Sequence, residues 1–182
     1  LFHDARLTLA VSWRRRARRR AFAERFMQSQ ASRLLRAAHI ITGLRVEYHK
    51  PPFRLPGQFV LVTNHQSLVD IPVLISTFRP HHLKFVAKRE LMRKVPSVSK
   101  ILRYSEQAFI DRTGPFRGSH LALLRLAATT APQRGGSAVI FPEGTRSRDG
   151  HLRTFHTAGF RVLAREMQLP VVVAAVDGGW RM

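Results

Sequence analysis

The sequence predicts an α/β fold: a single domain with a mainly parallel central sheet flanked by helices, preceded by a basic amphipathic N-terminal helix. Short apolar runs that are typical of buried strands alternate along the chain with segments of helical periodicity, which is the pattern of βαβ units. The length of 182 residues fits one domain, and 45% of the residues are apolar, which is enough to build a core. An arginine-rich, helix-forming segment stands before the first buried strand.

The N-terminal segment 14–42 predicts a helix, because it is rich in Ala, Arg, Glu, Gln and Leu and contains no proline. Gly43 is expected to end it. Six arginines lie within residues 14–20, and a loosely helical apolar stripe consists of Phe22, Phe26, Leu34, Ala38 and Ile41. A basic amphipathic helix is typical of attachment to a membrane surface. An ordinary surface helix packed on the domain would show the same pattern.

The next elements follow from periodicity and turn residues. Residues 44–50 alternate like a strand, and the proline-rich stretch 51–57 predicts a turn. Residues 58–64 predict a buried strand that leads into a helix at 70–77, where Pro72 is tolerated in the first turn.

The second half of the chain continues the alternation. Strands are expected at 83–88, within 106–112, within 135–147 between a turn and a loop, and at 169–179, where the apolar run predicts a fully buried strand. Helices are expected at 89–96, 117–131 and 158–168. Strands that alternate with helices favour parallel pairing, because each helix provides the crossover to the next strand.

Composition narrows the functional classes. There are 31 Lys and Arg against 11 Asp and Glu, a net charge of +20, which favours an anionic partner: a nucleic acid, an anionic membrane surface or a phosphorylated substrate. No cysteine is present, which excludes a disulfide framework and a cysteine zinc site. No apolar run reaches 18 residues, so no transmembrane helix is expected. The adjacent His81 and His82 lack a third ligand at recognisable spacing and predict a surface loop, not a metal site.

His65 and Asp70 are the first candidate site, because they follow directly after the strand at 58–64. Within one helix, residues five apart point roughly 140° away from each other, so helical spacing alone would keep the two side chains apart. They can meet if His65 lies in the turn and Asp70 in the first helical turn. The aspartate would then fix the imidazole tautomer, and the other ring nitrogen would take a proton from a hydroxyl. A structural hydrogen bond would fit the same pattern, and Ser67 is expected to cap the helix.

Two further strand ends carry candidate binding residues. After the strand within 135–147, Gly144 permits close backbone approach, Thr145 offers a hydroxyl and Arg146 offers a planar guanidinium for phosphate oxygens. Glu143 would either hold that arginine or receive a substrate hydroxyl. Arg112 follows another strand and would be a second cation at the same sheet edge. A polar turn with a solvated ion pair and a surface arginine are the plainer alternatives.

The segments "NHQSLVD", "AFIDR", "FPEGTRS" and "LPVVVAAVDG" resemble, in this order, the four blocks of the glycerolipid acyltransferase family, whose best-known members are 1-acylglycerol-3-phosphate acyltransferases. The resemblance runs from about residue 44 to 178. It implies that His65 is the base and Asp70 its partner, and that Arg112 binds the phosphate of the acceptor. Further residues would line the acceptor site: Glu143, Gly144, Thr145 and Arg146.

By the same resemblance, a fatty acyl group moves from acyl-CoA or acyl-carrier protein to the hydroxyl of a lysophospholipid, foremost 1-acylglycerol-3-phosphate, to give phosphatidic acid. No metal and no bound cofactor are implied. Two departures from the family pattern are His156 and Ala158, which stand where lysine and glycine are usual. Another lysolipid acceptor, such as a lyso-ornithine lipid or lysophosphatidylglycerol, is an alternative within the family, and a non-catalytic lipid-binding relative is another.

These expectations divide the chain into a basic membrane-associating helical segment, 1–43, and an acyltransferase domain, 44–182, whose C-terminal end is expected to be truncated. The predicted location is the cytoplasmic face of a membrane, with a lysophospholipid, an acyl thioester and the anionic surface as partners. The residues leave the oligomeric state open. A basic nucleic-acid-binding protein is the alternative from another class, but the basic segments lack interleaved aromatic residues apart from Trp13 and no recognition motif is present.

Overall fold

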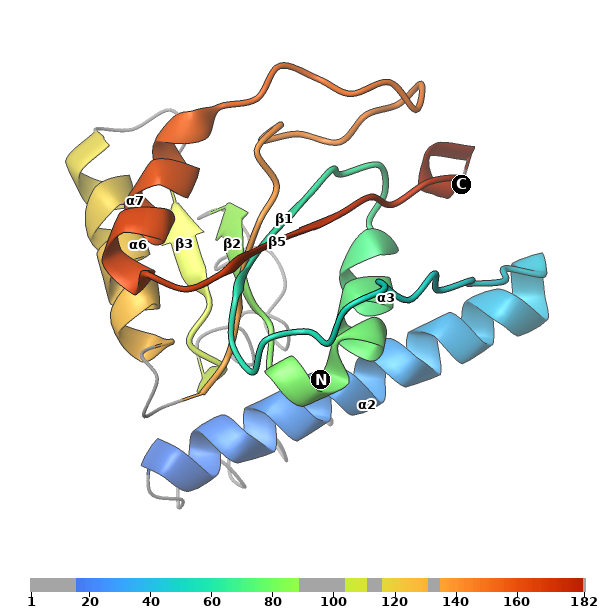
Figure 1. Cartoon of the computed structure of the whole chain (residues 1–182). Coiled ribbons are helices and arrows are strands. Elements are labelled where there is room, and N and C mark those ends of the chain that lie inside the picture. Colours follow the sequence, from blue (N-terminus) through green and yellow to red (C-terminus); the bar gives the residue numbers. More distant parts are fainter. Residues whose placement is uncertain (1–15, 89–103, 111–115, 131–134, 182) are drawn as a thin grey trace.

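The computed structural model describes residues 16–88, 104–110, 116–130 and 135–181. Its parallel strands form one sheet in the order β3-β2-β4-β1-β5 (Figure 1). The strands are β1 (Val60–Thr63), β2 (Lys84–Lys88), β3 (Ala108–Ile110), β4 (Ala138–Ile140) and β5 (Val171–Ala174). The helices are α2 (Arg16–Thr42), α3 (Asp70–Thr77), α6 (Phe116–Thr129) and α7 (Thr157–Met167), with short 3₁₀ turns at Arg79–His81 and Gly179–Arg181.

Helices cover both faces of the sheet, which confirms the predicted α/β fold with its N-terminal helix. Helices α6 and α7 lie on one face, and α3 lies on the other, with α2 running across α3 (Figure 1). Successive residues of a strand point to opposite faces. In β1, Val60 therefore belongs to the core under α6 and α7, whereas Leu61 belongs to the core under α3. The central strands are apolar on both faces for this reason.

Two expected strands differ in the structure. Residues 44–50 form a largely exposed loop, and no strand within the described ranges pairs with it. Alternation alone does not supply a neighbouring backbone to pair with. Strand β5 was expected to be fully buried, but it lies at the edge of the sheet. Its pairing partner is β1, and the side chain of Val173 is 77% exposed. The expected helix at 89–96 lies outside the described residues.

The predicted apolar stripe of helix α2 is buried only in part. Its buried residues are the small Ala23 and Ala31, whereas Leu34 and Ile41 of the expected stripe are exposed. Phe22, Phe26 and Ala38 of the stripe are half-buried, and the exposed apolar residues lie toward the C-terminal end of the helix. None of the helices in the described ranges has both the length and the apolar character needed to span a bilayer.

A buried ion pair fastens α2 to the sheet. The ammonium group of Lys84 on β2 is fully buried, and it donates hydrogen bonds to the carboxylate of Glu24 and, at 2.8 Å, to the carbonyl of Ser105. Arg20 donates to the same Glu24 oxygen at 3.0 Å. Burial by itself would raise the pKa of Glu24, but the charge and the hydrogen bond of Lys84 outweigh burial and lower that pKa. Burial lowers the pKa of Lys84 in spite of its pairing with Glu24.

Candidate active site

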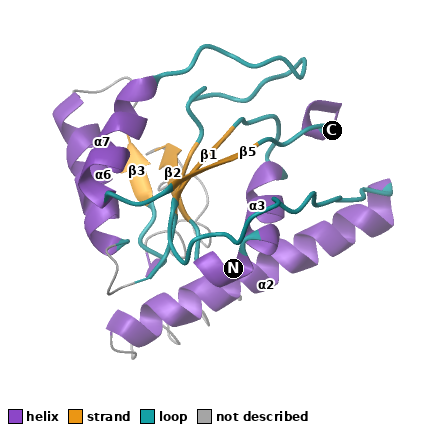
Figure 2. Cartoon of the chain, viewed as in Figure 1, coloured by secondary structure: helices purple, strands orange, loops and turns teal. Residues whose placement is uncertain are grey.

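The strand order brings two loops to one edge of the sheet. β1 and β4 are parallel neighbours, with Val60 opposite Ala138, so the chain leaves both strands in the same direction. The segments that follow them, 64–69 and 141–147, therefore begin side by side, as Figure 2 shows for the loops beyond the strands. The carboxyl ends of parallel strands are where α/β proteins collect their ligands.

His65 and Asp70 meet as the strand–turn–helix geometry predicts. His65 lies in the turn after β1, and Asp70 is the first residue of α3. Nδ1 of the histidine lies 2.8 Å from Oδ2 of the aspartate. A carboxylate only accepts hydrogen bonds, so Nδ1 carries the proton and donates it to this contact. Nε2 is then the nitrogen with a lone pair, which is the form that a general base requires.

Backbone groups and a glycine hold Asp70 in place. Its side chain is 1% exposed, and Oδ2 also accepts hydrogen bonds from the backbone N–H groups of Gln66 at 2.6 Å and Ser67 at 2.9 Å. Gly179 lies so close that a Cβ there would stand 2.9 Å from Oδ1. The hydroxyl of Ser67 accepts the N–H of Val69, the residue before α3, instead of an N–H inside the helix, so the expected helix cap is a turn contact. Together, these contacts restrict the orientation of the Asp70 carboxylate.

The imidazole of His65 is fixed from both the ring and the backbone. Its ring stacks on Phe141, which follows β4, with 4.2 Å between the ring centroids and 24° between the planes. The backbone N–H of His65 donates to Oε1 of Glu143 at 2.9 Å, and its carbonyl accepts the N–H of Ser147 at 2.7 Å. The loop after β4 therefore holds the loop after β1 in place, and with it the histidine.

Glu143 ties the two loops together. It is 2% exposed, and while Oε1 accepts from His65, Oε2 accepts from the backbone N–H of Arg153 at 2.8 Å. Both carboxylate oxygens are thus occupied by backbone donors. This geometry favours a positioning role over the two roles considered from the sequence, which were to hold Arg146 or to receive a substrate hydroxyl. Its predicted membership of the acceptor site remains a prediction.

The other predicted binding residues are Gly144, Thr145 and Arg146, in the turn after β4, and Arg112. Gly144 has a φ of +67° and closes the turn by donating its N–H to the carbonyl of Phe141 at 3.0 Å, so a glycine suits this backbone conformation. Thr145 and Arg146 follow it and are exposed at the same edge of the sheet as His65. Arg112 lies outside the described residues.

A local set of hydrogen bonds around Asp149 shapes the long loop after β4. The hydroxyl of Ser147 donates to Oδ1 of Asp149 at 2.9 Å, and the backbone N–H of His151 donates to the same oxygen at 3.1 Å. The hydroxyl of Ser147 is the main cause that lowers the pKa of Asp149, with His151 second. The carboxylate thus stays charged and joins Ser147 to His151 within this loop.

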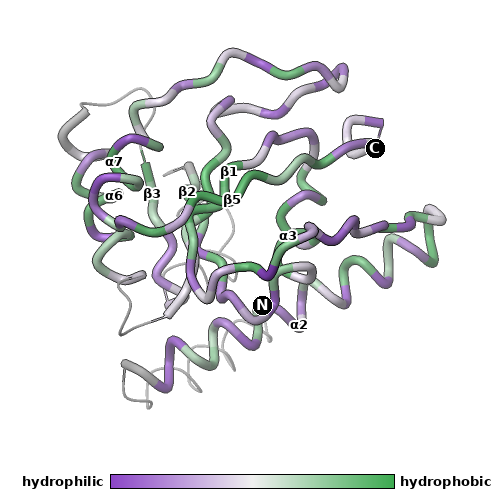
Figure 3. The backbone as a smooth tube through the Cα atoms, in the orientation of Figure 1, coloured by the Kyte–Doolittle hydropathy of each residue, from purple (hydrophilic) through white to green (hydrophobic). Residues whose placement is uncertain are grey.

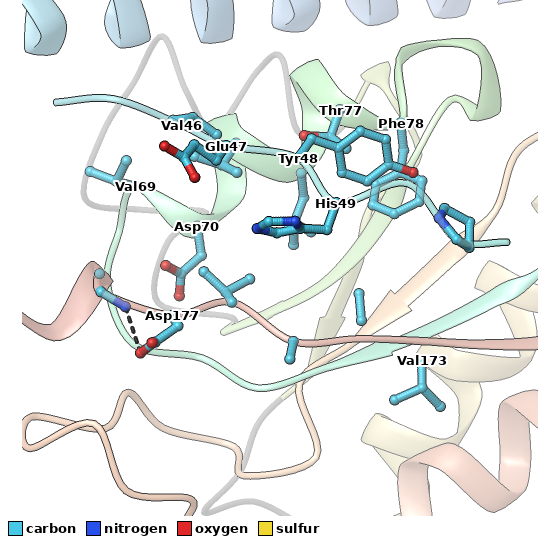
Figure 4. A pocket seen from close by; sticks show the side chains of 18 of the residues that line it. Val46, Glu47, Tyr48, His49, Val69, Asp70, Thr77, Phe78, Val173 and Asp177 are labelled. Carbon is cyan, nitrogen blue, oxygen red and sulfur yellow. Dashed lines mark hydrogen bonds between the residues drawn. The ribbon is translucent and has the colours of Figure 1, made fainter.

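A mostly apolar pocket of about 640 Å³ begins beside Asp70 (Figure 4). We call it the apolar pocket. Its walls come from residues 44–55, from α3 with the preceding Val69, and from residues 172–179. Val69, Val73 and Thr77 recur every four residues, so they present one face of α3 to the pocket. Among the described residues, no group of three or more His, Asp or Glu is arranged to hold a metal ion.

Several positioning residues were not singled out from the sequence. Phe141 supports the imidazole, Gly179 packs on Asp70, and the backbone of Arg153 binds Glu143. Phe141 and Gly179 lie far along the chain from their partners, and Arg153 lies ten residues after Glu143. Strand periodicity alone does not predict any of these contacts. The Gly178–Gly179 pair after β5 was the one hint that backbone passes close to another group there.

Comparison with known proteins places the chain among proteins of similar sequence and fold. A family model described as Acyltransferase matches residues 45–177. The 1-acyl-sn-glycerol-3-phosphate acyltransferase of Limnanthes douglasii is 30% identical over 152 residues, which are 79% of this chain and 52% of that protein. The alpha form of the same enzyme from Ovis aries is 32% identical over 134 residues, 71% of this chain and 44% of that protein. The chain spans about half the length of the curated relatives it matches.

Among solved structures, the crystal structure of PlsC, the 1-acyl-sn-glycerophosphate acyltransferase of Thermotoga maritima, superimposes with a TM-score of 0.70. The alignment covers 99% of this chain and 68% of that one, at 23% sequence identity. At this identity the likeness establishes a shared fold.

Proposed function

Because the chain belongs to the Acyltransferase family, we propose that it moves a fatty acyl group from an acyl thioester to the free hydroxyl of a lysophospholipid. The preferred acceptor is 1-acylglycerol-3-phosphate, which gives phosphatidic acid. The observation that carries the proposal is the 2.8 Å contact between His65 and Asp70 at the carboxyl edge of a parallel sheet. The curated relatives named after this reaction support the choice of substrate.

In the proposed step, Nε2 of His65 takes the proton of the acceptor hydroxyl as its oxygen attacks the thioester carbonyl. The new C–O bond forms, the C–S bond breaks, and the imidazolium returns the proton to the departing thiolate, so that a free thiol and an ester are released. Asp70 stabilises the positive imidazolium through its hydrogen bond to Nδ1. General base catalysis of this kind contributes roughly 10²–10⁴ to the rate.

The acceptor phosphate is proposed to bind at the turn after β4. The guanidinium of Arg146 is exposed beside the loop that carries His65, and a planar guanidinium matches two phosphate oxygens. Gly144 and Thr145 supply a close backbone approach and a hydroxyl in the same turn. Arg112, from the strand end after β3, is proposed as the second cation.

The acyl chain is proposed to lie in the apolar pocket. This pocket starts at Asp70, the residue proposed to hold the base, and about half of its lining residues are valine, leucine or phenylalanine. Burial of apolar chain atoms against such walls contributes about 0.8 kcal/mol per methylene group. A long chain would therefore gain several kcal/mol there.

Peripheral membrane association is proposed at the C-terminal end of α2, on the cytoplasmic face. Ile40 and Ile41 are 75% and 80% exposed, and Figure 3 shows this end of α2 as hydrophobic. Arg33 and Arg36 lie on the same helix, and the chain carries a net charge of +20. Exposed apolar side chains among arginines suit the boundary of an anionic leaflet. Sedimentation with anionic vesicles tests this proposal, and equal binding to neutral vesicles would contradict its electrostatic part.

The reaction is tested by thiol release. Purified protein with 1-acylglycerol-3-phosphate and a long-chain acyl-CoA is expected to liberate thiol in proportion to phosphatidic acid. His65→Ala should abolish this release, whereas His151→Ala, at an exposed histidine of the neighbouring loop, should leave it intact. Unchanged turnover in His65→Ala would exclude the mechanism. A panel of lysolipids, including lysophosphatidylglycerol and a lyso-ornithine lipid, separates the acceptors within the family.

A further inference from the structure

A second pocket, of about 450 Å³, lies beside the loops that hold His65. We call it the arginine pocket. It is lined by residues 66–69 between β1 and α3, by residues 146–148 of the turn after β4, and by Trp180. The backbone of the same two segments contacts Asp70 and His65, so whatever occupies this pocket is close to the proposed base.

Gln66 is a buried polar residue of this pocket. It is 6% exposed and belongs to the residues that line the pocket wall. Its backbone N–H is engaged by Asp70, but within the described part of the chain Oε1 has no hydrogen-bond partner. Buried polar atoms in folded proteins are nearly always hydrogen-bonded. A carbonyl oxygen can only accept a hydrogen bond, so the complement of Oε1 is an O–H or an N–H group.

The other walls favour an anionic ligand. Arg146 and Arg148 both line the pocket and are exposed, so two guanidinium groups are accessible there. A cationic ammonium group would be repelled by both. The hydrogen-bond donor that suits Gln66 is therefore a neutral hydroxyl, carried by a group that is negatively charged elsewhere.

Trp180 forms a rigid wall. A Cβ at Gly150 would lie 2.7 Å from its Nε1, so the indole rests directly on that glycine backbone. The guanidinium of Arg181 lies over its ring at 5.0 Å from the centroid. With both contacts in place the indole limits the size of a bound group.

We propose that the arginine pocket is a head-group specificity site of the acceptor, in which Oε1 of Gln66 accepts a hydrogen bond from a hydroxyl that accompanies the phosphate. This inference rests on the proposed function. The hydroxyl has two chemical sources, which are the protonated oxygen of a phosphomonoester and a hydroxyl of a phosphoglycerol head group. Gln66 is thus a specificity-determining residue that touches the acceptor but not the reacting atoms.

The test compares three acceptors of the same acyl chain: 1-acylglycerol-3-phosphate, lysophosphatidylglycerol and the methyl phosphodiester of the first. The methyl diester keeps a negative charge but has no head-group hydroxyl. Wild-type kcat/KM is expected to be roughly 10- to 100-fold lower for the methyl diester than for the better of the other two. In Gln66→Met, which keeps the side-chain length, this discrimination should fall to within about threefold, through KM rather than kcat. Gln28→Met on α2 serves as the matched control.

Binding of the deacylated head groups gives a readout independent of turnover. Glycerol 3-phosphate, glycerophosphoglycerol and glycerophosphomethanol are titrated by calorimetry into wild type, Gln66→Met and His65→Ala. If head-group discrimination vanishes in Gln66→Met but persists in His65→Ala, the proposed specificity site is supported. This holds even if no thiol is released and the proposed reaction is refuted. Turnover with no discrimination in wild type, or discrimination retained in Gln66→Met, overturns the pocket while leaving the reaction standing. Tm values confirm that each variant is folded.

Discussion

Replacement of Asp70 by asparagine isolates the contribution of the carboxylate. The amide has nearly the same volume as the carboxylate. Its oxygen can still accept hydrogen bonds from the backbone N–H groups of Gln66 and Ser67, which lie 2.6 and 2.9 Å from Oδ2 of Asp70 in the wild-type protein. What it loses is the negative charge that stabilises the imidazolium of His65 through the 2.8 Å contact. We expect kcat/KM to fall roughly 10²- to 10⁴-fold. Such a loss corresponds to about 3–5 kcal/mol of transition-state stabilisation.

The assay is thiol release under saturating acyl-CoA, with the acceptor varied. Because Asp70 acts through His65, the loss should appear in kcat, with the KM of the acceptor changed little. The variant should still fold, because the hydrogen bonds from Gln66 and Ser67 are kept. Each of them is weakened by about 1 kcal/mol, because its acceptor is no longer charged. Glu166→Gln on the exposed side of α7 makes the same carboxylate-to-amide change away from the site. A folded Asp70→Asn variant with kcat within about threefold of wild type would refute the catalytic pairing.

Two further predictions concern stability. Glu24→Gln leaves the ammonium of Lys84 buried without its counter-charge and should lower the free energy of unfolding by about 3–5 kcal/mol in urea denaturation. The pKa of Glu24 lies below its ordinary value of 4.5. The stability difference between wild type and Glu24→Gln should therefore be full above pH 4.5 and disappear as the pH falls through the lower pKa of the folded state. A stability difference that does not change with acidification would contradict the pairing. Gly179→Ala places a Cβ 2.9 Å from Oδ1 of Asp70, and it should lower the free energy of unfolding by about 1–3 kcal/mol and also lower kcat. Gly57→Ala is the control, because a Cβ there meets nothing within 4 Å, and it should change neither quantity. Equal behaviour of the two variants would argue against the clash.

The elements that the sequence predicted correctly are those set by local periodicity. The helix at 70–77 has the bounds expected from its pattern, and the strand at 58–64 encloses β1. The contact between His65 and Asp70 belongs to this class, because strand, turn and helix follow one another within a few residues. Their proximity needs no distant part of the chain.

Other features depended on which segments become neighbours, and periodicity does not carry that information. The alternation at 44–50 predicted a strand, but no strand in the part of the chain that the structure describes pairs with it. The apolar run of β5 looked fully buried, but its place at the sheet edge leaves Val173 exposed. Likewise, nothing in the sequence indicated that Glu143 accepts the backbone N–H of His65, a contact that the adjacency of β4 and β1 brings about.

The sequence by itself therefore determined the α/β class, most of the order of its elements and the contact between His65 and Asp70, since all of these follow from side-chain patterns along a short stretch of chain. Only the tertiary structure decided the strand order, which part of α2 is buried and the pocket walls around Gln66 and Trp180. The physical reason is that a hydrogen bond or an apolar contact depends on distance in space, and the sequence states only distance along the chain.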